Sequence, residues 1–364
     1  MRKTVIATLM CAFPLIIVAQ KWLGGDVSLL PTYEKNRTEY FDFNGNATPA
    51  TTIFRQEGWN MMRVRLFVDP QNAPEENKGE GVCQDLPYVI ALSKRLKSEG
   101  FKLMLDLHYS DTWADPGKQF TPKRWKKLGK QTLCDSIYSY TCNVLKALKA
   151  NNIMPDMIQV GNEITFGMLW PTGRVEPTRH KNWKVLGQML RAGSRSCREI
   201  CPEAKIIIHT EHIYDWEATK AYYSNLSKLG VDYDIIGLSY YPMWHKDIGL
   251  LGKHLSLLEE QFPDKPVMIV ETAFYYSHEN DVWESDPNHY SDLFPISKEG
   301  QAAFTRELVE ELNQHKNVTG LFWWFPEENE SGKPVIKSWI NRGLFDNRSG
   351  KVLPALKEMK QFLK

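Results

Sequence analysis

The segment MIQVGNEITFG at residues 157–167 starts as a mostly apolar run and ends with Asn162 beside Glu163. A short apolar run is typical of a strand that is covered on both faces, as in a parallel sheet. The segment PVMIVETAF at residues 266–274 repeats the pattern and places Glu271 near its end. Because a charged side chain at the end of a buried strand carries a desolvation cost, two such strand ends indicate a functional site.

Further strands of this type lie on both sides of these two segments, and helical patterns separate them. The predicted strands are residues 24–28, 58–70, 101–109, 156–163, 205–210, 234–242, 266–272 and 318–326. The predicted helices are residues 87–97, 134–151, 181–200, 216–229, 250–261, 298–314 and 353–364. This alternation predicts the α/β class, as a single (β/α)8 TIM barrel with elongated βα loops. A doubly wound open sheet is the alternative, but the GxGxxG fingerprint that usually follows its first strand is missing.

The first 20 residues, MRKTVIATLMCAFPLIIVAQ, have the layout of a secretory signal peptide. Arg2 and Lys3 precede an apolar run, and Ala19 supplies the small residue that a signal peptidase needs. The run is short for a membrane anchor, which needs about 20 apolar residues. The sequence therefore predicts an exported protein that is secreted, periplasmic or held at the cell surface. Its barrel domain would occupy residues 21–364, with no stable membrane span after cleavage.

The net charge limits the classes of binding partner, and the number of cysteines limits the possible disulfides. The net charge is +1 and the isoelectric point about 7.6, so neither a nucleic acid nor an acidic membrane surface is predicted as a partner. Five cysteines follow the predicted signal peptide, and this odd number leaves at least one outside any intramolecular disulfide. Export is compatible with a disulfide, whose connectivity stays open. The cysteines are Cys83, Cys134, Cys142, Cys197 and Cys201.

Polar side chains end most of the predicted strands, which is where a barrel places its active site. They are Asp26, Ser28, Arg63, Arg65, Asp106, His108, Asn162, Glu163, His209, Glu211, Ser239, Tyr240, Tyr241 and Glu271, and the eighth strand adds Trp323 and Trp324. We expect Glu163 on the fourth strand and Glu271 on the seventh to face each other across the mouth. Two such carboxyl groups suit glycoside hydrolysis, in which one protonates the leaving oxygen while the other attacks the anomeric carbon or activates water. A gap of about 5–5.5 Å between them would give retention of configuration.

The sequence resembles a known family over nearly its whole length after the signal peptide. The segments GGDVS, RVRLFVDP, LDLHYSDTWADPGKQ, IQVGNEI, GMLWP, IGLSYYPMWH and IVETAF are similar to glycoside hydrolase family 53. That family comprises endo-β-1,4-galactanases of the clan of retaining (β/α)8 glycosidases, which act on galactan side chains of pectin. The resemblance implies a glycan-binding cleft, with β-1,4-galactan and galacto-oligosaccharides as partners.

The resemblance also implies roles for individual residues. By motif position, Glu163 corresponds to the acid/base and Glu271 to the nucleophile, and Asn162 precedes the acid/base as it does throughout the clan. Tyr241 corresponds to the tyrosine that contacts the nucleophile, with Tyr240 as the neighbouring alternative. The remaining substrate-binding candidates are Arg63 or Arg65 as the clan arginine, His108, Asp111, and the aromatic platforms Trp113, Trp244 and Trp324.

Three features depart from the family pattern, and one of them is the fifth strand, whose IIHTEH differs from the more usual family sequence. The chain has WWFPEEN after the eighth strand, where the family often has W-E-P-x-W, so contacts on that side are open. Bacterial relatives can bind calcium in the loop after the seventh strand. Here that loop offers Asp281, Asp286 and Asn288 but no regular series of ligands, so a structural calcium is a candidate only. Catalysis by two carboxyl groups requires no cofactor.

Three alternative functions remain. A related barrel hydrolase could cut another β-1,4-linked chain, such as mannan or glucan. A non-catalytic glycan-binding protein on the same fold would be expected to lack one of the two glutamates, and both are present. A phosphate-binding barrel enzyme would need a Gly-rich loop near the last two strands, and none is visible in the sequence.

Overall fold

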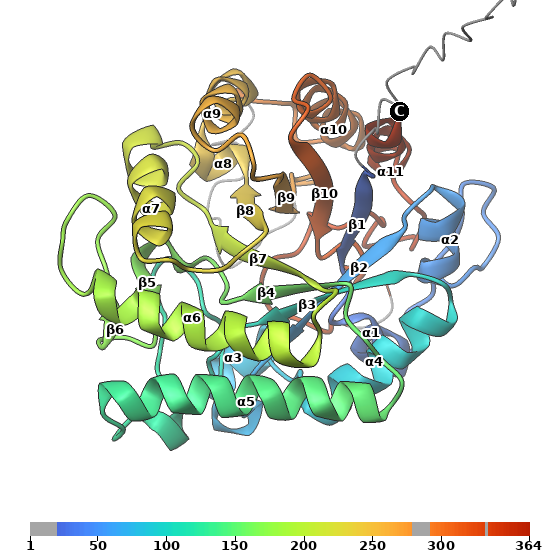
Figure 1. Cartoon of the computed structure of the whole chain (residues 1–364). Coiled ribbons are helices and arrows are strands. Elements are labelled where there is room, and N and C mark those ends of the chain that lie inside the picture. Colours follow the sequence, from blue (N-terminus) through green and yellow to red (C-terminus); the bar gives the residue numbers. More distant parts are fainter. Residues whose placement is uncertain (1–19, 279–291, 332–333) are drawn as a thin grey trace, which may run out of the picture.

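The computed structural model describes residues 20–278, 292–331 and 334–364. Eight parallel strands close into one barrel, which confirms the predicted (β/α)8 fold (Figure 1). In ring order they are β1 (Trp22–Asp26), β2 (Met61–Leu66), β3 (Lys102–Leu107), β4 (Met157–Val160), β7 (Lys205–Thr210), β8 (Ile235–Tyr240), β9 (Val267–Thr272) and β10 (Val318–Trp324). Pairing of β10 with β1 completes the ring. The predicted signal peptide lies outside the described residues, except for Gln20.

Helices surround the barrel, as Figure 1 shows. The long ones are α4 (Leu86–Ser98), α5 (Lys130–Ala150), α6 (Trp183–Ile200), α7 (Trp216–Lys228), α9 (Ile248–Gln261) and α10 (Lys298–Leu312), followed after β10 by the short α11 (Ala355–Met359). Four of them begin at a capping side chain that accepts a hydrogen bond from the first turn, which satisfies an otherwise unpaired backbone N–H group. These caps are Asp85, Asp215, Asp247 and Ser297.

Shorter elements lie in the loops and were not predicted individually. They are α1 (Leu30–Lys35), α2 (Ala50–Gln56), α3 (Glu75–Gly79), α8 (Pro242–His245), the 3₁₀ helices η1 (Pro70–Asn72), η2 (Lys123–Trp125), η3 (Ile164–Phe166) and η5 (Lys360–Leu363), and the hairpin of β5 (Gly167–Met168) with β6 (Gly173–Arg174). Each is too short to show a hydrophobic period, which needs a window of about 11 residues or more. The predicted helix at 353–364 is α11 continued by the 3₁₀ helix η5.

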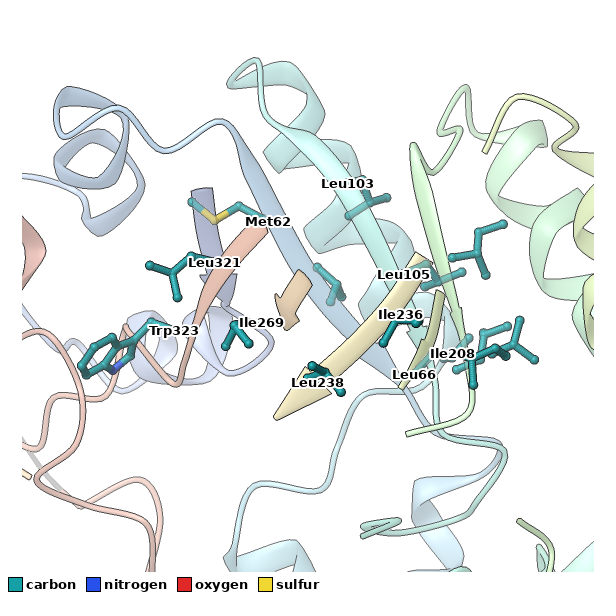
Figure 2. Packing of buried hydrophobic residues seen from close by; sticks show 14 of the residues in the cluster. Met62, Leu66, Leu103, Leu105, Ile208, Ile236, Leu238, Ile269, Leu321 and Trp323 are labelled. Carbon is teal, nitrogen blue, oxygen red and sulfur yellow. The ribbon is translucent and has the colours of Figure 1, made fainter. Parts of the chain in front are cut away.

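Two apolar layers hold the barrel. The outward faces of the strands pack against the helices, and Figure 2 labels ten of these buried residues, among them Leu105, Leu238 and Trp323. The inward faces form a separate cluster of Met61, Met104, Met157, Ile207, Ile235, Met268, Val270 and Phe322. Most of these residues come from the N-terminal halves of their strands, with Val270 and Phe322 nearer the middle, so the barrel has an apolar floor. Alternation along each strand then brings polar residues to the inside at the opposite end.

All five cysteines in the described part of the chain are free thiols. Four of them are buried, which is typical of cysteines that serve as small apolar residues. Within the described ranges no helix is both long and apolar enough to cross a bilayer.

Candidate active site

A buried ion network lies directly above the apolar floor of the barrel. Arg63 on β2 pairs through Nη1 with Asp26 and through Nη2 with Asp106 and Glu271, each at 2.8 Å. The Nη2 group also donates to Asn162 Oδ1 at 2.7 Å. Buried charges are tolerated when they are paired and hydrogen-bonded, as these are. Arg63 therefore links β1, β3, β4 and β9 at the end where the strands open.

Glu271 points into the barrel because β9 contains an extra residue. Leu238 of β8 pairs with Ile269, but the next residue, Ser239, pairs with Glu271. The pairing of β9 with β10 shows the same shift, from Leu321–Ile269 to Trp323–Thr272. Strict alternation from the inward-facing Met268 would turn Glu271 toward the helices. The bulge reverses this and aims the carboxyl group at the cavity, which is a common role of bulges near active sites.

The contacts of Glu271 favour ionisation more strongly than the contacts of Glu163 do. Besides the Arg63 ion pair, Glu271 accepts a hydrogen bond from the Tyr241 hydroxyl at 3.0 Å. Burial raises the pKa of Glu271 to about 7, and the Arg63 guanidinium and the Tyr241 hydrogen bond oppose that increase. The charges of Asp106 and Asp26 raise it further. Near neutral pH, Glu271 is the carboxyl group that ionises first.

Glu163 occupies a strained turn at the end of β4. Gly161 has φ +88°, and a Cβ atom there would lie 2.9 Å from the Ile164 side chain, so the turn requires glycine. Glu163 itself adopts the left-handed conformation, with φ 48° and ψ 51°. Non-glycine residues held in this region are uncommon and cluster at functional sites. Gln119 stabilises the turn by donating to the backbone oxygens of Asn162 and Glu163 at 2.8 and 3.2 Å.

The environment of Glu163 favours its protonated form. Burial raises its pKa well above the ordinary value, and the nearby charges of Glu271 and Glu211 raise it further. Its carboxyl oxygen lies 2.6 Å from the Ser239 hydroxyl. Within the described ranges no ion pair reaches Glu163, in contrast to Glu271. The two glutamates thus differ in pKa in the sense that an acid and a nucleophile require.

Both glutamates line one cavity of about 450 Å³ at the open end of the barrel. Aromatic rings form much of its wall, with Trp324 and Trp339 in edge contact at 4.5 Å between ring centroids. Trp244, at the rim, is 46% exposed and therefore accessible to a ligand. Eight of the residues predicted from the sequence line this cavity: His108, Trp113, Asn162, Glu163, Tyr241, Trp244, Glu271 and Trp324.

Three predicted substrate-binding residues lie outside the cavity lining. Arg63 and Arg65 are fully buried. Arg65 pairs with Asp26 at 2.8 Å, and its guanidinium packs 4.7 Å from the Trp113 ring centroid. Of the two arginines, Arg63 is the one that contacts Glu271. Asp111 accepts a hydrogen bond from the Lys123 backbone at 2.8 Å and supports the loop after β3.

The structure shows what His108 and Tyr241, two further predicted substrate-binding residues, contact. His108 reaches the cavity wall, but both ring nitrogens bond within the protein, Nε2 to Asp106 at 2.9 Å and Nδ1 from the Ala114 backbone at 3.3 Å. Tyr241, not Tyr240, contacts the nucleophile candidate, since the Tyr240 hydroxyl donates to the Lys246 backbone.

Several cavity residues had no role assigned to them from the sequence. Trp339 contacts the rings of Tyr241, Trp244 and Trp324, yet it lies in a loop after β10 that has no repeating pattern. Glu211 and His212 follow β7 and bond to each other at 2.8 Å. The general enrichment in tryptophan was the one sequence signal for Trp339, whereas Glu211 was predicted among the polar residues at strand ends but without a role.

The acidic residues of WWFPEEN turn away from the cavity and do not line it. Glu327 accepts from the Leu29 backbone at 2.9 Å and Glu328 from the Gly343 backbone at 3.0 Å. Burial raises the pKa of each to about 8. The departure from the family pattern at this point therefore affects the support beneath the site.

The calcium candidates Asp281, Asp286 and Asn288 lie outside the described residues. In the part of the chain that the structure describes, no cluster of three or more potential metal-ligating side chains is present.

The barrel brings two glutamates, whose surroundings favour different protonation states, to one cavity lined by aromatic rings. This is the active-site arrangement of a (β/α)8 glycoside hydrolase. The sequence profile described as glycosyl hydrolase family 53 matches residues 22–359. The chain belongs to this family, as the resemblance predicted.

Curated and solved relatives agree with the family assignment. A probable arabinogalactan endo-beta-1,4-galactanase A from Neosartorya fischeri is 33% identical over 312 residues, covering 83% of each chain. The solved GH53 catalytic domain from Ignisphaera aggregans superimposes with a TM-score of 0.83 at 30% identity, over 98% of this chain and 99% of that one. A structure from a study of two fungal beta-1,4-galactanases gives a TM-score of 0.80 at 30% identity, over 94% and 99% of the chains.

Proposed function

We propose that this glycoside hydrolase is an exported, retaining endo-β-1,4-galactanase that cleaves pectic galactan into galacto-oligosaccharides. The observation that carries the proposal is that Glu163 and Glu271 line one cavity and that Arg63 forms an ion pair with Glu271 and not with Glu163. Two relatives support the choice of substrate, because the curated protein from Neosartorya fischeri and the structure from the study of fungal enzymes are described as β-1,4-galactanases.

In the first step, a Glu271 oxygen attacks the anomeric carbon of the bound galactose. Glu163 gives its proton to the glycosidic oxygen, so the bond to the leaving sugar breaks and a galactosyl ester of Glu271 forms. Arg63 and Tyr241 favour the ionised nucleophile, since both donate to its oxygens. Burial of Glu163 near other acidic groups keeps the acid protonated at neutral pH.

In the second step, the Glu163 carboxylate accepts a proton from a water molecule, and the water oxygen attacks the same carbon. The ester bond breaks, Glu271 is restored as a carboxylate, and Glu163 is protonated again. Two inversions at one carbon give net retention. The cycle needs two carboxyl groups and no metal. A structural calcium bound by Asp281, Asp286 and Asn288 is therefore a separate proposal about stability.

Substrate binding is assigned to the aromatic wall of the cavity. Trp113, Trp324, Trp339 and Trp244 present ring surfaces that suit the apolar faces of galactose units. Trp324 is assigned to the sugar before the cleavage point, and the exposed Trp244 to a more distant unit. Binding of several units along one wall is what cleavage inside a chain requires.

The test is product analysis on linear β-1,4-galactan, with β-1,4-mannan and cellulose as alternative substrates. We expect oligosaccharides from galactan, with the β anomer formed first in a time-resolved proton NMR experiment. Strong cleavage of mannan without cleavage of galactan would reject the substrate, and an initial α anomer would reject the double displacement. Glu271→Ala should bind galactan with little turnover, whereas a non-catalytic binding protein would show no turnover in either form. Export is tested separately, by locating the protein in fractionated cells and culture medium.

A further inference from the structure

Two buried residues connect Glu163 to the ion network of Arg63. The Ser239 hydroxyl, at the end of β8, lies 2.6 Å from Glu163 Oε1. On its other side it lies 2.8 Å from His209 Nε2, and His209 Nδ1 lies 3.0 Å from Asn162 Oδ1. Both Ser239 and His209 are fully buried. The direction of each hydrogen bond in this chain follows from the groups at its far end.

The orientation of the Asn162 amide is fixed by two groups that have a single role each. Arg63 can only donate, and its Nη2 lies 2.7 Å from Asn162 Oδ1. The Ala114 carbonyl can only accept, and Asn162 Nδ2 lies 2.9 Å from it. Asn162 therefore presents an oxygen to His209, and His209 Nδ1 must carry the hydrogen, because two acceptors 3.0 Å apart in a buried site would repel each other. The Glu163 backbone N–H also points at this nitrogen, but its 3.4 Å separation is longer than the 3.0 Å contact with Asn162 Oδ1, so the shorter contact decides which nitrogen carries the hydrogen.

His209 is neutral, so its second ring nitrogen is an acceptor. Burial lowers the pKa of His209 well below its ordinary value, and the positive charge of the nearby Arg63 guanidinium acts in the same direction. A neutral imidazole with hydrogen on Nδ1 has a free lone pair on Nε2. The one hydrogen of the Ser239 hydroxyl is then directed at His209. Toward Glu163, the hydroxyl can only accept.

We propose that Ser239 and His209 are positioning residues that hold a proton on Glu163 Oε1. The chain runs from the Glu163 hydroxyl to Ser239, from Ser239 to His209 Nε2, and from His209 Nδ1 to Asn162. This inference rests on the proposed function, in which Glu163 is the acid of the first step and the base of the second. Its direction differs from the usual role of a serine beside a carboxylate, which is to donate and to lower the pKa of the acid.

The other groups that face Glu163 act in the same direction as this chain. The acidic residues around it raise its pKa: Glu271 from β9, Glu211 after β7 and Asp115 from the loop after β3. The Tyr241 hydroxyl from β8 also faces both glutamates and stays protonated, since burial raises its pKa well above the ordinary value. The hydrogen bond and the surrounding negative charge both favour protonated Glu163. Glu163 can therefore act as an acid at neutral pH in the first step and as a stronger base in the second.

The first test is the pH profile of kcat/KM for Ser239→Ala. Removal of an acceptor from protonated Glu163 should move the alkaline limb to lower pH by about half a unit to one unit. If Ser239 were a donor to the carboxylate, the same substitution would move that limb to higher pH. An upward shift or an unchanged limb overturns the proposal. Ser196→Ala removes a buried hydroxyl from α6, which does not line the cavity, and should leave the profile unchanged.

The second test uses the unmodified enzyme and does not require activity. Nitrogen-15 NMR of the histidine side chains at neutral pH should show His209 with hydrogen on Nδ1 and none on Nε2, and Asn162→Asp serves to assign its signals by their shift. Hydrogen on Nε2, or an imidazolium, overturns the proposal. If the enzyme does not cleave galactan, the proposed function fails, while this measurement still decides the direction of the hydrogen-bond chain.

Discussion

Tyr241→Phe should shift the acidic limb of the pH profile to higher pH. The Tyr241 hydroxyl donates to Glu271 Oε2 at 3.0 Å in a buried site. A hydrogen bond to a charged group contributes about 1.5–3 kcal/mol, so its loss should raise the pKa of Glu271 by about 1–2 units. Because the reactive form is the carboxylate, a limb that lies at about 7 in the native enzyme should move upward. At pH 6 this corresponds to a loss of about 10- to 100-fold in kcat/KM.

The assay is kcat/KM on β-1,4-galactan between pH 5 and pH 10. Phenylalanine keeps the ring contacts of Tyr241 with Trp244 and Trp339, whose centroids lie 5.4 and 5.5 Å away. Tyr240→Phe is the matched control, because its hydroxyl donates to the Lys246 backbone and should not affect the limb. An unchanged acidic limb in Tyr241→Phe, or an equal shift in Tyr240→Phe, would refute the assignment of this hydrogen bond.

Two further predictions concern stability and binding. Burial raises the pKa of Glu327 to about 8, so the folded state retains a proton that the unfolded chain loses, and the free energy of unfolding should fall by a few kcal/mol as pH rises from about 4.5 to 8. Glu327→Gln keeps an acceptor for the Leu29 backbone and should make this dependence less steep in denaturant titrations at pH 5 and pH 8, while the contribution of Glu328 remains. An equally steep dependence would contradict the buried protonated acid. Trp244→Ala should raise KM for long galactan about 5- to 30-fold with little change in kcat, through about 1–2 kcal/mol of lost stacking. Phe43→Ala, another exposed aromatic residue outside the cavity lining, should leave KM unchanged, and equal KM values for both variants would remove Trp244 from the binding surface.

The barrel was predictable because its strands are apolar runs with interior positions that repeat every two residues. That period also explains why Arg63 and Arg65 could not be distinguished by sequence. Both side chains point into the barrel, and their difference is their depth along β2. The Arg63 side chain reaches Asp106 and Glu271, whereas Arg65 is two residues nearer the mouth and packs against Trp113.

The orientation of Glu271 could not be predicted from the two-residue alternation of side chains along a strand. Alternation along VMIVET places Met268, Val270 and Thr272 on one face and Glu271 on the other. The extra residue in β9 changes that assignment, and a bulge in a parallel strand has no distinct local sequence signature here. The family resemblance identified Glu271 correctly as a cavity residue, whereas alternation from Met268 would have excluded it.

Other parts of the site depend on contacts between distant segments. Trp339 reaches the cavity through a loop that has no periodic pattern, and its partners are Tyr241, directly after β8, and Trp324, at the end of β10. The hydrogen-bond chain through Ser239 and His209 joins three strands and depends on the orientation of one amide. Such relations become visible once the barrel closes.

Trapping of the glycosyl-enzyme tests the central claim, that Glu271 attacks the sugar while Glu163 acts as the acid. The reagent is a 2-deoxy-2-fluoro galactobioside with an activated leaving group. The fluorine slows both steps, whereas the leaving group speeds the first step only, so the ester intermediate can accumulate. After digestion, mass spectrometry should find the label on the peptide that contains Glu271, and Glu271→Gln should not be labelled. A label on Glu163 or elsewhere, or turnover without any covalent species, would contradict the account.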